Sequence, residues 1–125
     1  MYNILICDDE KDIVNALKIY LHDENYRLYE AFNGVEALEF IERNEIHLVL
    51  MDIMMPEWNG YEATVQIRKS DKSDAQSIPI IAMTANTFAD DIQKSKESGM
   101  NAHIGKPINV EVLMSTLEKF RNNLL

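Results

Sequence analysis

The chain has 125 residues, 46% of them hydrophobic, which is the usual size and composition of one domain with one core. Its 21 acidic and 12 basic residues give a net charge of −9, which excludes the basic surface that binds nucleic acid or an anionic membrane. No apolar run is long enough to cross a bilayer, and the N-terminus lacks the basic start of a signal peptide. We therefore expect one cytoplasmic domain over residues 1–125.

Five short apolar runs recur along the chain and predict β-strands. They are Tyr2–Cys7, Tyr26–Ala31, Leu48–Met51, Ile78–Met83 and Ala102–Gly105. The first, third and fourth are almost continuously apolar, which is typical of parallel strands covered on both faces. The second alternates polar and apolar residues, so we expect it at an edge of the sheet or half covered. Cys7, the only cysteine, should be a small buried apolar residue.

Segments with helical spacing lie between the strands. Apolar residues share a face in the sets Ile13, Val14, Leu17 and Leu21; Val35, Leu38 and Ile41; and Val110, Leu113, Leu117 and Phe120. Weaker helices are predicted over Asn59–Ser70 and Asn86–Ser98, with turns or caps at Asn33-Gly34, Asn59-Gly60 and Ser98-Gly99.

Strand–helix alternation repeated five times predicts a parallel sheet with helices on both faces and right-handed crossovers. Periodicity does not determine the order of the strands. We choose 2-1-3-4-5, the order of the doubly wound, flavodoxin-like α/β fold. In such folds the functional site lies beyond the carboxyl ends of the strands.

Polar residues follow the predicted strands at that edge of the sheet. Asp8, Asp9 and Glu10 follow the first strand, Asp52 the third, Thr84 the fourth, and Lys106 the fifth. Carboxylates gathered this closely repel one another unless a cation joins them, and Mg²⁺ suits a few carboxylates and waters. The alternative is that Asp8 and Asp9 only cap the next helix. That alternative does not explain Asp52, whose charge ends a buried strand.

Lys106 and Thr84 complete a set of groups suited to phosphoryl transfer. Such a transfer needs an in-line nucleophile, a metal, and positive or hydroxyl donors for the phosphoryl oxygens. The carboxylate of Asp52 can accept a phosphoryl group to form an aspartyl phosphate. Taken singly, Thr84 could be a helix-capping hydroxyl and Lys106 a surface lysine, but the joint arrangement favours a phosphoryl site.

Together these residues resemble the receiver domain of two-component response regulators. The resemblance covers essentially the whole chain. It rests on Asp8-Asp9, on Met51-Asp52-Ile53-Met54-Met55-Pro56 with Gly60, on Met83-Thr84-Ala85, and on Lys106-Pro107.

The resemblance implies a role for each matching residue. Asp52 would be the phosphoacceptor, and Thr84 and Lys106 would bind the phosphoryl group. Mg²⁺ would be bound by Asp9 directly, by Asp8 largely through water, by Asp52, and by the backbone carbonyl of Met54. The Lys106–Pro107 peptide bond is expected to be cis.

The conformational switch of the family involves Thr84 and a residue of the fifth strand. Phosphorylation draws the threonine inward, and an aromatic residue then turns into the vacated space. That residue here is His103, where the family usually has Tyr or Phe. Histidine keeps a planar ring but is smaller, polar and able to titrate near neutral pH. The alternative is that His103 is simply an exposed residue at the end of a strand.

Other residues near the expected site have weaker assignments. Met54 and Asn86 occupy positions that border the phosphate in this family, where the residues tend to tune the access of water to it. Trp58 is interpreted as a hydrophobic lid. His22 and His47 have no ligand spacing with His103 and are interpreted as surface or helix-end residues.

The resemblance also implies partners. The phosphoryl donor would be a sensor histidine kinase or a histidine phosphotransfer protein, and the downstream protein target is not identified. The family's usual signalling surface comprises Asn86–Ser98, the fifth strand and the last helix, and we expect a monomer or a weak dimer. The first strand begins at residue 2, which favours a free-standing receiver over one cut from a hybrid sensor kinase.

Two other functions remain open. A small Mg²⁺-dependent phosphatase with an aspartate nucleophile usually needs a second acid two residues later, and Met54 occupies that position. An unphosphorylated receiver-like interaction module would be expected to have lost acids or the lysine, and all are present. A dinucleotide-binding fold is weaker still, because acids follow the first strand where a Gly-rich loop would be needed.

Overall fold

The computed structural model describes residues 2–22, 25–55, 57–72, 74–85 and 89–123. Strands and helices alternate within them: β1 (Tyr2–Cys7), α1 (Lys11–Tyr20), β2 (Tyr26–Ala31), α2 (Gly34–Arg43), β3 (Leu48–Asp52), α3 (Gly60–Arg68), β4 (Ile80–Thr84), α4 (Ala89–Ser98), β5 (Ala102–Gly105) and α5 (Val110–Asn123). The strands form one parallel sheet in the order β2-β1-β3-β4-β5. The predicted fold class and strand order are therefore confirmed.

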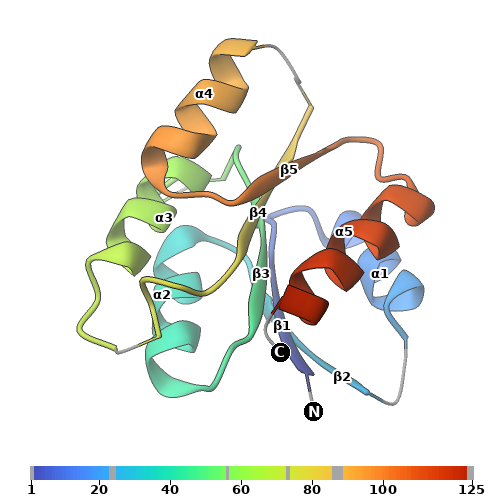
Figure 1. Ribbon diagram of the computed structural model, residues 1–125, viewed down its shortest axis with the longest axis horizontal. Coiled ribbons are helices and arrows are strands. Elements are labelled where there is room, and N and C mark those ends of the chain that lie inside the picture. Colours follow the sequence, from blue (N-terminus) through green and yellow to red (C-terminus); the bar gives the residue numbers. More distant parts are fainter. Residues whose placement is uncertain (1, 23–24, 56, 73, 86–88, 124–125) are drawn as a thin grey trace.

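Helices cover both faces of this sheet. α1 and α5 lie on one face, and α2, α3 and α4 lie on the other (Figure 1). Each face has its own buried apolar cluster; Leu5 and Val49 belong to one cluster, while Ile6 and Leu50 belong to the other. Neighbouring residues of a strand point to opposite faces, so a strand in the middle of this sheet must be apolar throughout. Burial of each such side chain contributes roughly 1.5 to 3 kcal/mol.

Some predicted boundaries and helix faces are wrong. β4 begins at Ile80 and not at Ile78, because the Ile78 N–H donates to the Asp74 carbonyl in a turn. Val110 is 41% exposed and lies outside the buried face of α5, which Leu113 and Leu117 form. The predicted helix Asn86–Ser98 is described only from Ala89 onwards, and Asn86 lies outside the described residues.

The buried face of α2 also differs from the prediction. Its fully buried residues are Gly34, Ala37 and Ile41; Leu38 is partly buried but packs against the core as predicted, whereas Val35 is only partly buried. The reason is close packing, because a Cβ atom at Gly34 would lie 3.0 Å from the Cβ of Ala63 in α3.

The predicted caps are confirmed. The side chain of Asn33 accepts a hydrogen bond from the Glu36 N–H at the start of α2, and Asn59 forms a capping box at the start of α3. Gly99 has a φ angle of 107° at the end of α4, where a residue without Cβ is favoured. Among the described residues, no helix has both the length and the apolar character that a membrane span requires.

Candidate functional site

Four of the predicted site residues meet at the carboxyl ends of the strands. The Nζ atom of Lys106, after β5, donates to Asp52 Oδ1 at 3.0 Å and to Asp8 Oδ2 at 3.1 Å. Thr84, at the end of β4, pairs with Gly105 in the sheet, and its carbonyl accepts the N–H of Lys106 at 2.8 Å. The predicted convergence of Asp8, Asp52 and Lys106 is therefore confirmed, and the backbone of Thr84 lies beside Lys106. The Lys106–Pro107 peptide bond is cis, as predicted.

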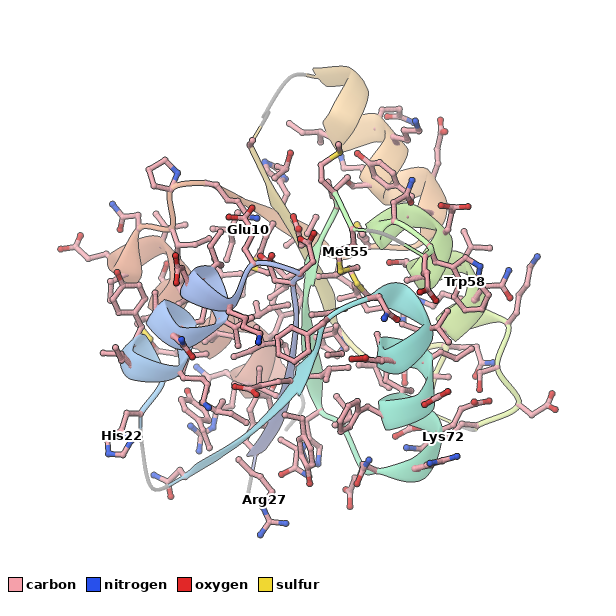
Figure 2. All side chains as sticks on the ribbon, turned by 180° about the vertical axis from the view of Figure 1, so that it is seen from behind. Glu10, His22, Arg27, Met55, Trp58 and Lys72 are labelled. Atoms are coloured by element: carbon pink, nitrogen blue, oxygen red, sulfur yellow. The ribbon has the colours of Figure 1, made fainter. Side chains whose placement is uncertain are left out.

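The carboxyl ends of the strands, where these residues meet, lie at one end of the molecule (Figure 2). Figure 2 shows Glu10 and Met55 toward the site, and His22, Arg27 and Lys72 toward the opposite end.

The two central carboxylates are buried. Asp8 is 0% exposed and Asp52 is 2% exposed. Asp52 Oδ1 accepts from Lys106 and, at 3.4 Å, from the Met54 N–H, but Asp52 Oδ2 is buried and has no hydrogen-bond partner among the described residues. Two buried carboxylates thus share one ammonium group, and one of their oxygens is left unsatisfied.

Burial and charge displace the pKa values of this group. Burial, followed by the charge of Asp8, raises the pKa of Asp52 to about 6, against the opposing effects of Lys106 and the Met54 N–H. Burial alone would lower the pKa of Lys106, but its contacts with Asp52 and Asp8 outweigh burial, so the pKa is raised. The site therefore favours a protonated lysine and penalises the charge on Asp52.

Asp8 also belongs to a second group of acidic residues. The carboxylate oxygens of Asp8, Asp9 and Glu10 lie within 4.8 Å of one another. Asp8 Oδ1 accepts the Glu10 N–H at 3.0 Å, so Asp8 also supports the turn that leads into α1. The sequence placed Glu10 at this edge of the sheet together with Asp8 and Asp9, but Glu10 was not among the predicted metal ligands.

These residues fit a magnesium ion. Hard carboxylate oxygens are the ligands that Mg²⁺ prefers, and the unpartnered Asp52 Oδ2 is an oxygen whose burial a cation would compensate.

The remaining predicted residues are placed in different ways. His103 is exposed on β5, and the Met54 side chain is 77% exposed. Trp58 is partly buried and packs against the core on the α2–α3 face. Cys7 is buried as predicted, and burial raises the pKa of its thiol.

The two other histidines differ from each other. His22 is an exposed residue just after α1, as predicted. His47 is only partly the surface residue that was predicted, because its side chain is 28% exposed and also makes contacts in the sheet. Its Nδ1 atom accepts the Asn3 N–H at 2.8 Å and its ring stacks on Tyr2, which fixes it between β1 and β3.

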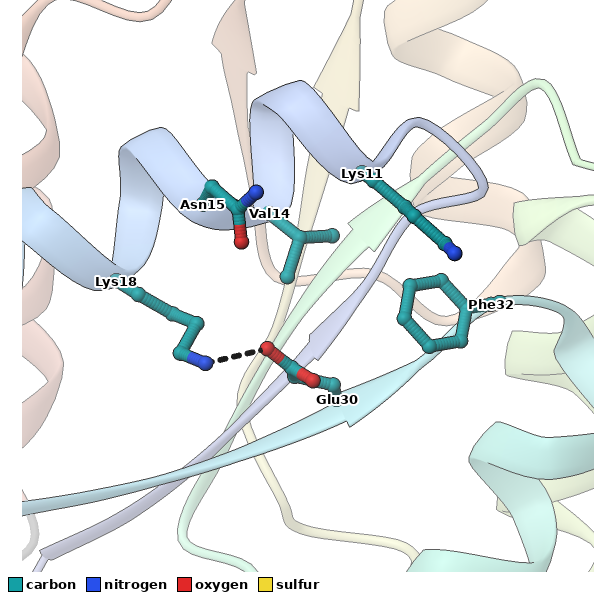
Figure 3. Close-up of a pocket in the computed structure, with 6 residues that line it drawn as sticks. All are labelled: Lys11, Val14, Asn15, Lys18, Glu30 and Phe32. Carbon is teal, nitrogen blue, oxygen red and sulfur yellow. Dashed lines mark ion pairs between the residues drawn. The ribbon is translucent and has the colours of Figure 1, made fainter.

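Two cavities lie along α1. The first has a volume of about 320 Å³ and is separate from the site; its lining, which includes the ion pair of Lys18 with Glu30, belongs to α1, β2 and Phe32 (Figure 3). The second is a largely apolar groove of about 260 Å³ that adjoins the site, because Lys106 is one of its lining residues.

A comparison with known families agrees with this geometry. A family model described as the response regulator receiver domain matches residues 4–118. The chain belongs to this family. Receiver domains are signalling switches of two-component systems, so the resemblance seen in the sequence is confirmed and the alternative functions are not favoured.

Individual proteins show the same likeness. The receiver is 36% identical, over 95% of its length, to hybrid signal transduction histidine kinase B of Dictyostelium discoideum, and spans 7% of that protein. The structure of chemotaxis protein CheY4 of Vibrio cholerae has a TM-score of 0.89 and 28% identity, covering 96% of this chain and 98% of that one. The receiver domain of sensor histidine kinase PA1611 from Pseudomonas aeruginosa, which holds a magnesium ion in its active-site cleft, has a TM-score of 0.86 and 29% identity, covering 95% and 96%.

Proposed function

We propose that this receiver domain accepts a phosphoryl group on Asp52 from a phosphohistidine of a sensor histidine kinase or histidine phosphotransfer protein, and then changes a partner-binding surface. The observation that carries the proposal is the carboxylate of Asp52, which ends a buried strand; Lys106 donates to one of its oxygens, and no described residue donates to the other. In the transfer, the N–P bond of the donor breaks and an O–P bond to Asp52 forms. The donor imidazole leaves with the electron pair of the broken bond and takes up one proton.

The surrounding residues would each contribute to this reaction. Asp8, Asp9, Asp52 and the backbone carbonyl of Met54 would hold Mg²⁺. When bound, the ion supplies positive charge to the carboxylates and to the oxygens of the transferred group. Lys106 would donate to those oxygens in place of Asp52, and the Thr84 hydroxyl would donate from the end of β4.

The proposal is tested with a small phosphodonor. Acetyl phosphate and Mg²⁺ should add the mass of one phosphoryl group to the wild-type chain, because the P–O bond of the donor breaks as the O–P bond to Asp52 forms. The Asp52→Asn variant should show no gain, whereas Asp71→Asn, at an exposed aspartate beyond α3, should be labelled like the wild type. An unlabelled wild-type chain, or an undiminished gain in Asp52→Asn, would contradict the proposal.

We propose that the donor protein docks in the apolar groove beside Lys106. Residues of α1, including Ile13, Ala16 and Tyr20, line one side, and Pro107 and Ile108 line the other. Because Lys106 both lines the groove and contacts Asp52, an occupant of the groove is placed next to the acceptor. A partly apolar partner surface carrying the phosphohistidine fits this lining.

Docking is tested with two neighbouring residues of α1. Tyr20 lines the groove and is 39% exposed, whereas Ile19 is 73% exposed and does not line it. Tyr20→Ala should slow transfer from a kinase that phosphorylates the wild type by about tenfold, equivalent to about 1.4 kcal/mol, without changing labelling by acetyl phosphate. Ile19→Ala should leave both rates unchanged. Equal losses in the two variants, or no loss in Tyr20→Ala, would rule out this groove.

The only other reaction we propose is the hydrolysis of the domain's own aspartyl phosphate. Met54 occupies the position where an aspartate-dependent phosphatase would need an acid to protonate its leaving group. Repeated turnover of a simple phosphomonoester by the wild-type chain would contradict the proposal that the domain hydrolyses only its own aspartyl phosphate.

A further inference from the structure

The loop between Asp52 and α3 contains two residues in an unfavourable backbone conformation. Glu57 has a φ angle of 47° and Trp58 one of 67°. This left-handed region is disfavoured for residues that carry a Cβ atom, and such residues persist in it only where surrounding structure holds them. The contacts that hold this loop therefore decide how it responds to a change at Asp52.

The first of these contacts comes from the beginning of α2. The Gly34 N–H donates to the Glu57 carbonyl at 3.2 Å. A Cβ atom at Gly34 would lie 2.6 Å from the Trp58 carbonyl oxygen, so the backbones of α2 and the loop are in direct contact. On the other side, a Cβ atom at Gly60 would lie 2.5 Å from the Asp52 carbonyl oxygen. Glu57 and Trp58 thus contact the first residue of α2, and the start of α3 packs against the end of the acceptor strand.

A second contact joins the same two segments through β1. The buried thiol of Cys7 lies 3.4 Å from the sulfur of Met55 in the loop and 3.5 Å from the carbonyl oxygen of Asn33. Asn33 is the N-cap of α2, and its side chain accepts the Glu36 N–H. Met55, through Cys7, and Glu57, directly, are therefore linked to the N-terminal turn of α2.

We propose that the first turn of α2 is an output of the site, to which loading of Asp52 is transmitted through the loop and Gly34. The inference rests on the proposed function, in which Asp52 and the Met54 carbonyl bind the metal and the phosphoryl group. Binding of the metal to the Met54 carbonyl would restrain Met54. This restraint would change the conformational equilibrium of the loop, in which Glu57 and Trp58 are already strained. Because closely packed atoms cannot interpenetrate, a small displacement of the loop forces the residues packed against it into a different arrangement. This route is separate from the predicted switch through Thr84 and His103.

Amide hydrogen exchange in the wild-type chain tests the proposal directly. The chain is loaded with acetyl phosphate and Mg²⁺, and loading is verified by its mass. The amides of Gly34 and Glu36 should change their exchange rates about fivefold or more, while that of Glu42 near the end of α2 should stay constant. A loaded chain with unchanged exchange at Gly34 overturns this inference and leaves the proposed function standing. A chain that cannot be loaded overturns both.

The coupling must also operate in the reverse direction. Gly34→Ala places a methyl group against the Trp58 backbone and should displace the loop, which should weaken the Mg²⁺ affinity of the phosphoryl-free chain about fivefold. The control is Glu39→Gly, which destabilises α2 at an exposed position outside the buried face of Gly34, Ala37 and Ile41. It should leave the affinity unchanged. If Gly34→Ala binds Mg²⁺ like the wild type, or if Glu39→Gly weakens binding equally, the inference fails; exchange in the wild type decides the matter if Gly34→Ala does not fold.

Discussion

Replacing Asp52 by asparagine should stabilise the metal-free receiver at neutral pH by about 3 kcal/mol. Burial and the charge of Asp8 raise the pKa of Asp52 from 3.8 to about 6 in the folded protein. A shift of about two units corresponds to about 3 kcal/mol, and this net value already includes the opposing effect of the contact with Lys106. The folded chain holds this proton more tightly than the unfolded chain. The stability that this group contributes is therefore complete below pH 3.8 and is lost as the pH rises through 6.

Urea denaturation in the presence of EDTA measures this effect. The gain in the free energy of unfolding of Asp52→Asn over the wild type should be present at pH 7.5 and should disappear near pH 4. Asp71→Asn, which alters an exposed carboxylate, should show no comparable gain. Mg²⁺ should raise the stability of the wild type more than that of Asp52→Asn, because binding to the folded state stabilises it by mass action. A variant less stable than the wild type at pH 7.5 would contradict the account of Asp52.

The expected gain in the stability of Asp52→Asn shows that the buried carboxylate destabilises the metal-free domain, and such a destabilising group suits a switch. A carboxylate that is unfavourable in the empty site favours whatever neutralises it, whether a proton, a cation or a covalently bound group with a metal beside it. Loading of the site then changes the free energy of the folded domain and not only the occupancy of a pocket. Local sequence rules are commonly broken at functional positions for this reason.

Much of the fold was predictable because its signals are local. The continuous apolar runs of β1, β3 and β4 follow from burial on both faces, and the alternation in β2 follows from its place at the edge of the sheet. The site was predictable from the same signals, because parallel strands deliver whatever follows them to one edge. Asp8, Asp52 and Lys106 each follow or end a strand, so their meeting required only the correct topology.

Contacts between distant segments were not predictable in this way. Gly34 was interpreted only as part of a turn or cap, yet it packs on the backbone of Trp58 and close to Ala63 of α3. His47 follows no periodic pattern, and its partner Asn3 lies in another strand. A glycine or a histidine has the same local signal whether or not a distant backbone approaches it, so only the assembled structure distinguishes these roles.

Arg68 is the clearest residue of this kind. In the sequence it is one more basic residue at the end of a predicted helix, where cations are common. In the structure its guanidinium is held by backbone and side-chain oxygens of two other segments. It donates to the carbonyls of Gly99 at 2.8 and 3.2 Å, Ala75 at 3.0 Å and Ile78 at 2.8 Å, and to the side chain of Asn101 at 2.9 Å. It therefore joins the end of α3 to the segment before β4 and to the turn between α4 and β5.

Arg68→Met should consequently destabilise the domain by about 3 kcal/mol, because it removes these hydrogen bonds and leaves partly buried carbonyls without a donor. Arg68→Lys should recover less than half of the loss, since one ammonium cannot reproduce a planar fork that serves several acceptors. Arg43→Met, at an exposed arginine in the last turn of α2, should cost less than about 0.5 kcal/mol. The partners of Arg68 are neutral oxygens, so 1 M salt should leave its loss unchanged, whereas a surface ion pair would be screened. A loss for Arg68→Met no larger than that for Arg43→Met, or one that vanishes in salt, would show that this guanidinium does not hold the three segments together.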